Sequence, residues 1–185
     1  MQILKAIIIW SAGLILTACA TTAPNPLNAE TRDQFFVKST QVTWNLSEKE
    51  QAIEEKKDAN DQGKRAAGRK IIEDKLTSIV SQEFANSPSG PTPVDFNIAI
   101  KRYHRVGNVT GNLLGVGSDF LAADVIVTDS TTGQELAVYE EVTGYRQSGG
   151  GVIGAVVQAA SDPDIEGVMA LKFSERLRKR FDKKK

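Results

Sequence analysis

The chain has 185 residues, in which 23 Lys and Arg residues balance 23 Asp and Glu residues, and it contains one cysteine and one histidine. The zero net charge gives no support to a nucleic-acid partner. A single cysteine excludes an intramolecular disulfide and a multi-cysteine metal site. The length fits one domain with a sizeable core.

The N-terminal residues follow the pattern of a secretory signal. Lys5 precedes an apolar run over residues 7–15, and small residues come next. A basic start, an apolar stretch and a small-residue cleavage site together predict export from the cytoplasm. The run is too short to span a bilayer, which requires about 20 apolar residues. Ordinary secretion, with cleavage near Ala18 or Ala20, is one interpretation.

The second interpretation assigns a role to the cysteine. Leu16-Thr17-Ala18-Cys19 resembles the lipobox of bacterial lipoproteins: an apolar residue, two small residues and the cysteine that is lipidated. The resemblance implies removal of residues 1–18, a diacylglyceryl group on the Cys19 thiol and acylation of the new amine. Two or three acyl chains would hold the protein at a membrane, because one chain alone binds only marginally. This covalent lipid is the only attached group that we expect.

Sorting between membranes depends on the residue after the cysteine. In enteric-type bacteria an aspartate there retains a lipoprotein in the inner membrane, and this chain has Ala20 instead. The resemblance therefore implies the periplasmic face of the outer membrane. The rule holds in some lineages only, so the inner membrane stays open as an alternative.

A tether is predicted after the cysteine. The residues that follow Cys19 are small and polar and include Pro24 and Pro26. Such a composition is typical of a flexible linker. We expect a tether over residues 19–33 and a single domain over residues 34–185.

The first half of the domain predicts a strand and a long helix. Residues 35–46 are rich in β-branched and aromatic side chains. Ser47 and Glu50 match a capping box, so a helix should follow to about residue 86, with a break near Gly63. Its apolar stripe recurs every three to four residues: Ala66, Ala67, Ile71, Ile72, Leu76, Ile79, Val80 and Phe84.

Three strands are predicted next, over residues 94–106, 120–129 and 135–145. Alternation indicates that one face of the first two is buried, and that Leu136 and Val138 point inward from the third. Residues 129–133 predict a hairpin turn. Glu140 and Glu141 interrupt the alternation and predict a bulge or an exposed edge. The inward residues of the first two strands are Val94, Phe96, Ile98, Ile100, Leu121, Ala123, Val125 and Val127.

A second helix closes the chain. Asp162-Pro163-Asp164 reads as an N-cap, a proline at the first helical position and an acid at the positive end of the helix dipole. We therefore expect an α+β fold of order β-α-β-β-β-α, with a small, mostly antiparallel sheet and two helices packed on one face. The apolar stripe of this helix is Ile165, Met169, Phe173, Leu177 and Phe181.

Two glycine-rich segments are the candidate interaction surface. A phosphate-binding interpretation of the first lacks a third glycine, because Phe120 stands in its place, and no Gly-Lys-Ser/Thr follows. In the second, Gly150 and Gly154 form a small-xxx-small pair. That pair indicates either tight packing on the sheet or an apolar patch for self-association or membrane contact. The candidate glycines are Gly107, Gly111, Gly115, Gly117, Gly149, Gly150, Gly151 and Gly154.

No catalytic or metal-binding constellation is predicted. His104 is the only histidine and stands at the end of a predicted strand, where a solvated side chain is expected. A serine triad or a two-histidine metal site would depend on it, and one histidine supports neither well. Asp162, Asp164 and Glu166 alternate like calcium ligands, but Phe173 stands where the closing glutamate should be. Helix capping explains these acids better.

The C-terminus is basic, with one Asp182 among its cations. Cations suit the negative end of a helix dipole, so a solvated helix end is one interpretation. Contact with anionic lipid, lipopolysaccharide or peptidoglycan is the other. The cations are Arg176, Arg178, Lys179, Arg180, Lys183, Lys184 and Lys185.

Residues 103–157 carry a second resemblance. The stretch contains Arg105-Val106-Gly107-Asn108, then Val125-Ile126-Val127-Thr128-Asp129 and Thr132-Gly133-Gln134-Glu135-Leu136, and ends in the glycine cluster at residues 149–154. It resembles short bacterial outer-membrane lipoproteins that carry a glycine-rich domain of unknown function. The resemblance implies the location and the fold, and no activity.

The sequence therefore predicts a non-enzymatic, lipid-anchored protein of the periplasm that serves as a binding or assembly module. Its partners would be the membrane and either an envelope protein or a second copy of the chain. An accessory subunit of an envelope transporter, with a sheet edge pairing with a partner strand, is an alternative. A small envelope hydrolase is another, and it would need an acid/base pair in a pocket.

Overall fold

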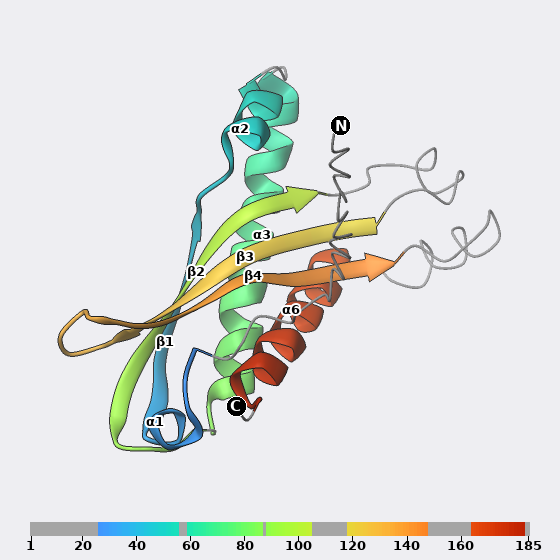
Figure 1. Ribbon diagram of the computed structural model, residues 1–185. Helices are drawn as coiled ribbons and strands as arrows, with labels where there is room; N and C mark the ends of the chain where they lie inside the picture. Colours follow the sequence, from blue (N-terminus) through green and yellow to red (C-terminus); the bar gives the residue numbers. More distant parts are fainter. Residues whose placement is uncertain (1–25, 56–58, 87, 105–117, 148–163, 184–185) are drawn as a thin grey trace, which may run out of the picture.

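The computed structural model describes residues 26–55, 59–86, 88–104, 118–147 and 164–183. The helices and strands within these ranges are shown in Figure 1. They are α1 (Ala29–Asp33), β1 (Phe35–Trp44), α2 (Glu48–Glu55), α3 (Ala59–Phe84), β2 (Thr92–His104), β3 (Ser118–Asp129), β4 (Glu135–Gln147) and α6 (Ile165–Phe181).

The four strands form one sheet in the order β1-β2-β3-β4. β1 runs parallel to β2, whereas β2 with β3 and β3 with β4 are antiparallel. A parallel pair needs a crossover connection, and the chain between β1 and β2 contains α2 and α3. The predicted α+β class with a mostly antiparallel sheet is confirmed.

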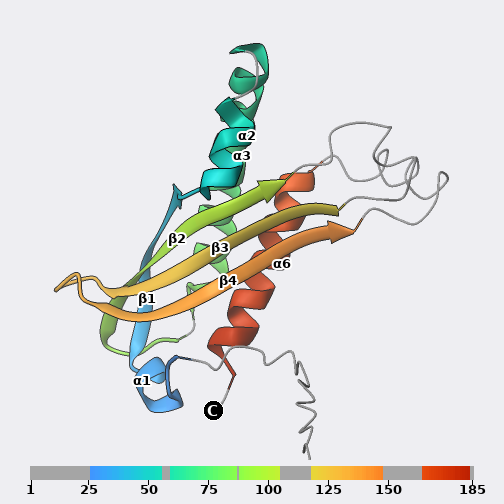
Figure 2. The ribbon, with the colours of Figure 1, turned by 45° about the horizontal axis from the view of Figure 1, so that its top comes forward.

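Both long helices pack on the same face of the sheet (Figures 1 and 2). α3 contacts β1, α6 contacts β4 and β3, and the two helices contact each other. Each helix turns one side chain in four toward the sheet, as expected for amphipathic helices. The fully buried stripes are Ile72, Leu76, Val80 and Phe84 on α3, and Met169, Phe173, Leu177 and Phe181 on α6.

Aromatic rings from four elements meet at the centre of the core. Phe84 of α3, Phe96 of β2 and Phe181 of α6 have ring centroids 5.0 to 5.9 Å apart, and Tyr139 of β4 lies 6.1 Å from Phe181. Tilted and edge-to-face contacts at such distances add to the free energy of burial. Burial also raises the pKa of Tyr139, so its phenol stays neutral.

The inward face of β4 differs from the prediction. The buried residues are Ala137 and Tyr139, so the predicted inward orientation of Val138 is wrong. Leu136, beside a second register shift, is partly buried and packs against the core. The predicted bulge is confirmed: the pairing shifts by one residue between β3 and β4 at Glu140 and Glu141. Glu141 adopts φ 46°, and its amide donates to the Asp124 carboxylate at 2.9 Å.

The hairpin turn between β3 and β4 is also as predicted. Gly133 has φ 73°, a conformation in which a side chain would be strained. The Asp129 carboxylate accepts hydrogen bonds at 2.8 Å from the amides of Thr131 and Thr132. These bonds lower the pKa of Asp129, which therefore stays ionised and holds the turn.

Two predicted helix boundaries are wrong. α3 runs without interruption through Gly63, an exposed position, so the predicted break does not occur there and the helix tolerates the cost of about 1 kcal/mol for a glycine. α6 is capped by Asp164 rather than by Asp162, and the Asp164 carboxylate accepts from the Gly167 amide at 2.9 Å. Ser47 caps α2 as predicted, with its hydroxyl accepting from the Glu50 amide at 3.4 Å.

The folded domain begins earlier than predicted. Leu27 is buried in the core, and α1 follows it with Asn28 as its N-cap. Arg32 of α1 donates to the Phe181 carbonyl at the end of α6 at 3.1 Å. A tether over residues 19–33 is therefore wrong from Leu27 onward, because tertiary contacts stabilise a helix too short to form alone.

The sheet has two distinct ends. At the first, which we call the entry end, α1 leads into the chain, β1 and β2 begin, β3 turns into β4, and α6 ends. At the second, the glycine end, β2 ends, β3 begins, β4 ends and α6 begins. The 13 residues of β2 separate the two ends by roughly 43 Å at 3.3 Å per residue.

The part of the chain from Ala20 onward contains every described element. These elements share one hydrophobic core that extends from Leu27 to Phe181, so they fold as a unit. Within the described ranges, no helix combines the length and the apolar character that crossing a bilayer requires.

Candidate functional site

The strand ends that flank the two glycine-rich segments lie next to one another at the glycine end. His104 pairs with Phe120, and Ser118 pairs with Gln147, so segments 105–117 and 148–163 depart from and return to adjacent positions. The segments themselves lie outside the described residues, and so does Cys19. The candidate glycines in that position are Gly107, Gly111, Gly115, Gly117, Gly149, Gly150, Gly151 and Gly154.

A buried ion pair joins β3 to β4 at this end. Arg146 Nη1 lies 3.5 Å from Asp119 Oδ2, and the two side chains are only 9% and 8% exposed. Removal of one partner from such a pair leaves a buried charge without compensation, which costs about 3–5 kcal/mol. Asp119 and Arg146 therefore fix the two strand ends between which the glycine-rich segments leave the sheet.

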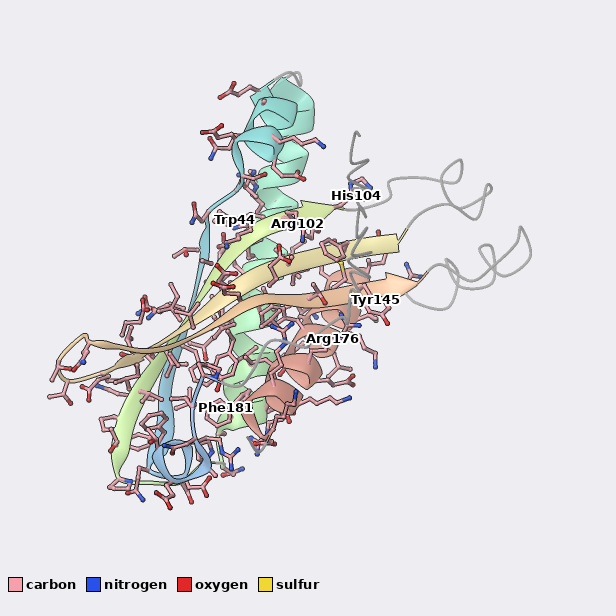
Figure 3. The ribbon with its side chains drawn as sticks, in the orientation of Figure 1. Trp44, Arg102, His104, Tyr145, Arg176 and Phe181 are labelled. Carbon is pink, nitrogen blue, oxygen red and sulfur yellow. The ribbon has the colours of Figure 1, made fainter. Side chains whose placement is uncertain are left out.

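Two arginine–aromatic contacts line the same end. Arg102 lies over the Phe120 ring at 5.2 Å, and Arg176 lies over the Tyr145 ring at 4.2 Å. Tyr145 is 42% exposed. Figure 3 shows His104 near the end of β2 and Tyr145 near the end of β4, with Arg102 further back along β2 and Arg176 further along α6. Tyrosine and arginine are enriched at protein interfaces, so these side chains suit a binding surface.

The start of α6 is attached to both neighbouring elements. Lys75 of α3 forms an ion pair with the Asp164 cap at 2.6 Å, and Tyr103 of β2 donates to Glu166 at 3.5 Å. The hydrogen bond from Lys75, followed by that from the Gly167 amide, lowers the pKa of Asp164. These contacts attach the start of α6 to α3 and to β2 at the glycine end.

The outer edge of β4 is occupied by the protein's own helix. Arg176 donates to the Thr143 carbonyl at 3.3 Å and to its hydroxyl. One turn further on, Arg180 donates to the Glu140 carbonyl and, at 3.5 Å, to that of Glu141. Backbone groups of an edge strand can pair with another chain, and these arginines occupy the carbonyls of Glu140, Glu141 and Thr143. The other edge strand of the sheet is β1.

The described residues assemble no recognisable catalytic group. His104 is exposed at the end of β2 and pairs only through its backbone register with Phe120. Among these residues, no three His, Cys, Asp or Glu side chains are grouped so that they could hold a metal ion.

Two open hollows of about 290 Å³ each occur on the described surface. One lies at the entry end and is lined by Arg32, Asp33, Pro88, Ser89, Phe181 and Asp182. The other is lined by Trp44, Leu46, Gln51, Glu55 and Arg69. Neither includes His104, so neither brings a serine, a histidine and a carboxylate together.

The Asp119–Arg146 pair was not predicted from the sequence. Pairing counted outward from the turn at Gly133 places Asp119 opposite Arg146 only after two register shifts, one beside Leu136 and one at Glu140 and Glu141, and only the second leaves a sequence signal. Opposite charges at facing positions of two strands are favourable. The contacts of Arg176 and Arg180 leave no such signal, because they depend on how the helix lies across the strand edge.

Comparison with known proteins identifies no family. No protein-family model and no curated protein matches the chain. Among solved structures, a Caulobacter crescentus CB15 protein described as a candidate lipoprotein has a TM-score of 0.40 at 11% identity, over 77% of this chain and 86% of that one. A variant of PelC from Paraburkholderia phytofirmans, solved as a dodecamer, also has 0.40 at 11%, over 82% and 90%. A second PelC dodecamer has 0.36 at 13%, over 78% and 86%.

Proposed function

We propose that the chain is a lipid-anchored protein of the cell envelope, held through Cys19 at the periplasmic face of the outer membrane. It acts there as a non-enzymatic binding or assembly module. The surface that binds its partner is the glycine end. The partner is an envelope protein or a second copy of the chain.

One observation carries this proposal: the strand ends that flank the two glycine-rich segments lie together, at the end of the sheet opposite to the one where the chain enters. β2 begins next to the start of β1, close to α1, and ends beside the start of β3. A lipid on Cys19 would hold the entry end near the membrane. The glycine end would then project roughly 43 Å into the periplasm, the length of β2.

The chemistry of the described residues at the glycine end supports binding rather than catalysis. Arg102 with Phe120 and Arg176 with Tyr145 present flat cationic and aromatic groups on a rigid base. Such groups lose little conformational entropy on binding and are frequent at the centres of interfaces. A hydrolase that used the single histidine would need it in a pocket, and neither of the two hollows described above includes His104.

Site-specific crosslinking tests the binding surface. With the only natural cysteine lipidated, Tyr145→Cys would carry the one free thiol of the mature chain, at an exposed position of the glycine end. Thr131→Cys, at the exposed hairpin turn of the entry end, is the matched control. We expect a thiol crosslinker added to intact envelopes to capture a partner or a second copy from Tyr145→Cys only.

Capture from Thr131→Cys alone would contradict the proposed surface. A stoichiometric complex with transporter subunits would favour the accessory-subunit alternative. Capture of a second copy of the chain would favour self-association. Gly150→Leu combined with Gly154→Leu then tests the glycines directly, because unchanged oligomeric state and folding would exclude both an interface and tight packing at that pair.

A further inference from the structure

The entry end carries the basic end of α6, and the length of chain before it limits how far it can lie from the membrane. This inference rests on the lipid anchor of the proposed function. Only residues 20–26 separate Cys19 from the buried Leu27. Even a fully extended chain of that length reaches roughly 28 Å, at 3.5 Å per residue. The entry end is therefore the part of the domain that the anchor keeps close to the lipid surface.

The C-terminus of α6 lies at this same end through direct contacts. Arg32, three residues after the start of α1, donates to the Phe181 carbonyl at 3.1 Å. Phe181 is the last residue of α6 and is fully buried. Figures 1 and 2 show α1 and the C-terminal end of α6 at the same end of the sheet. The bond from Arg32 therefore fixes the basic end of α6 beside the point where the chain enters.

Residues 178–183 and α1 together carry a net positive charge. Residues 178–183 carry four cations and one carboxylate, whereas α1 carries one cation and two carboxylates. Two of the carboxylates are already paired, Asp33 with Arg32 at 3.1 Å and Asp182 with Arg178 at 2.7 Å. The sequence continues with Lys184 and Lys185.

Lys179 and Lys183 are the cations best placed to meet an anionic surface. Both are exposed: Lys179 lies in the last turn of α6, and Lys183 directly follows the C-cap, Asp182. Arg178 and Arg180 lie beside them and contact Asp182 and the β4 carbonyls. The long aliphatic stems of the two lysines allow their ammonium groups to extend away from the protein.

We propose that the basic end of α6, through Lys179 and Lys183, binds the anionic headgroups of the membrane that anchors the chain. The contact is a second attachment beside the lipid, and it sets the orientation of the domain. With the entry end on the membrane, the glycine end faces the periplasm. Each Lys or Arg near an anionic surface strengthens binding roughly fivefold, and salt screens the effect.

Vesicle sedimentation tests the basic end without the lipid. The chain from Ala20 onward, which contains every described element, is mixed with vesicles of phosphatidylglycerol and phosphatidylcholine in equal parts, or of phosphatidylcholine alone. We expect binding to the anionic vesicles that falls with added salt. Lys179→Glu combined with Lys183→Glu should weaken it about 25-fold or more. Lys49→Glu combined with Lys70→Glu makes the same change in net charge away from this end, and it should weaken binding far less.

Each other outcome overturns the proposal. Equal loss in both double variants would mean that net charge alone governs binding, and equal binding to neutral vesicles would exclude headgroup charge. Sedimentation with insoluble peptidoglycan but not with vesicles would assign the basic end to the cell wall. The chain used in this experiment begins at Ala20 and lacks Cys19, so none of these results depends on lipidation. Lipidation is tested separately, by membrane fractionation of the full-length Cys19→Ser variant.

Discussion

Gly144 of β4 is the position where the backbone of α6 comes closest to the sheet, and Gly144→Ala tests that packing. A Cβ atom on Gly144 would lie 3.1 Å from both the Met169 carbonyl carbon and the Phe173 Cβ atom, and closer still to the Met169 carbonyl oxygen. The obstacle is helix backbone, which cannot rotate away as a flexible side chain can. α6 would have to move off the strand.

The expected cost follows from the general cost of overpacking, which is about 1–3 kcal/mol and occasionally more. Because the clash involves the backbone of a helix that carries four fully buried side chains (Met169, Phe173, Leu177 and Phe181), we expect the upper part of that range, about 3 kcal/mol. Typical domains have an unfolding free energy of about 5–15 kcal/mol, so the loss would be readily measured.

Urea unfolding of the chain from Ala20 onward measures the effect. Trp44 is the only tryptophan in that part and packs against Tyr103 with ring centroids 5.7 Å apart, so its fluorescence reports on the folded core. Gly68→Ala is the matched control, because nothing lies within 4 Å of its added Cβ atom and alanine favours a helix. It should raise the unfolding free energy by about 0.5–1 kcal/mol. Equal unfolding midpoints for Gly144→Ala and the unmodified chain would refute the described packing of α6.

Three further predictions follow from the polar contacts. Asp119→Ala should lower the unfolding free energy by about 3 kcal/mol in urea titrations, because it removes the partner of a buried charge. Adding Arg146→Met should restore most of that free energy, because the charge is then replaced by an apolar side chain. If the second substitution restored nothing, the pair would not be buried. Asp164→Ala should cost about 1 kcal/mol at neutral pH through loss of the cap. Since the pKa of Asp164 is lowered on folding, this stabilisation exists above the ordinary value of about 4 and disappears as the pH falls through the lowered pKa; a difference that persists unchanged in acid would contradict it. Arg176→Ala combined with Arg180→Ala should expose backbone carbonyls of β4 and cause concentration-dependent association, measured by sedimentation velocity. The control is Lys172→Ala combined with Lys179→Ala, which removes the same charge from α6 and should cause no association.

The sequence predicts the buried strands well because their signal is local. In β2 and β3 an apolar residue stands at every second position, on the inward face, and all eight of these positions are fully buried. In β4 the apolar Val138 suggests the wrong face. Tyr139 is inward because its ring reaches the Phe181 ring, a contact between residues 42 positions apart that no local pattern contains.

The start of the domain and the start of α6 could not be predicted for the same reason. α1 has five residues and depends on the Arg32–Phe181 bond and the burial of Leu27. The choice of Asp164 over Asp162 as the cap depends on Lys75, which comes from another helix. At the candidate site, the sequence identifies the two glycine-rich segments, while the sheet pairing brings their points of departure together.

Lipidation of Cys19 is the claim on which the location and the orientation of the domain both depend. Mass spectrometry of the N-terminal peptide from membrane-bound protein tests it most directly. We expect a peptide that begins at Cys19 and carries a diacylglyceryl group on the thiol and an acyl group on the N-terminal amine. An unmodified peptide that begins at Cys19 or at a neighbouring residue, or one that retains residues 1–18, would contradict it.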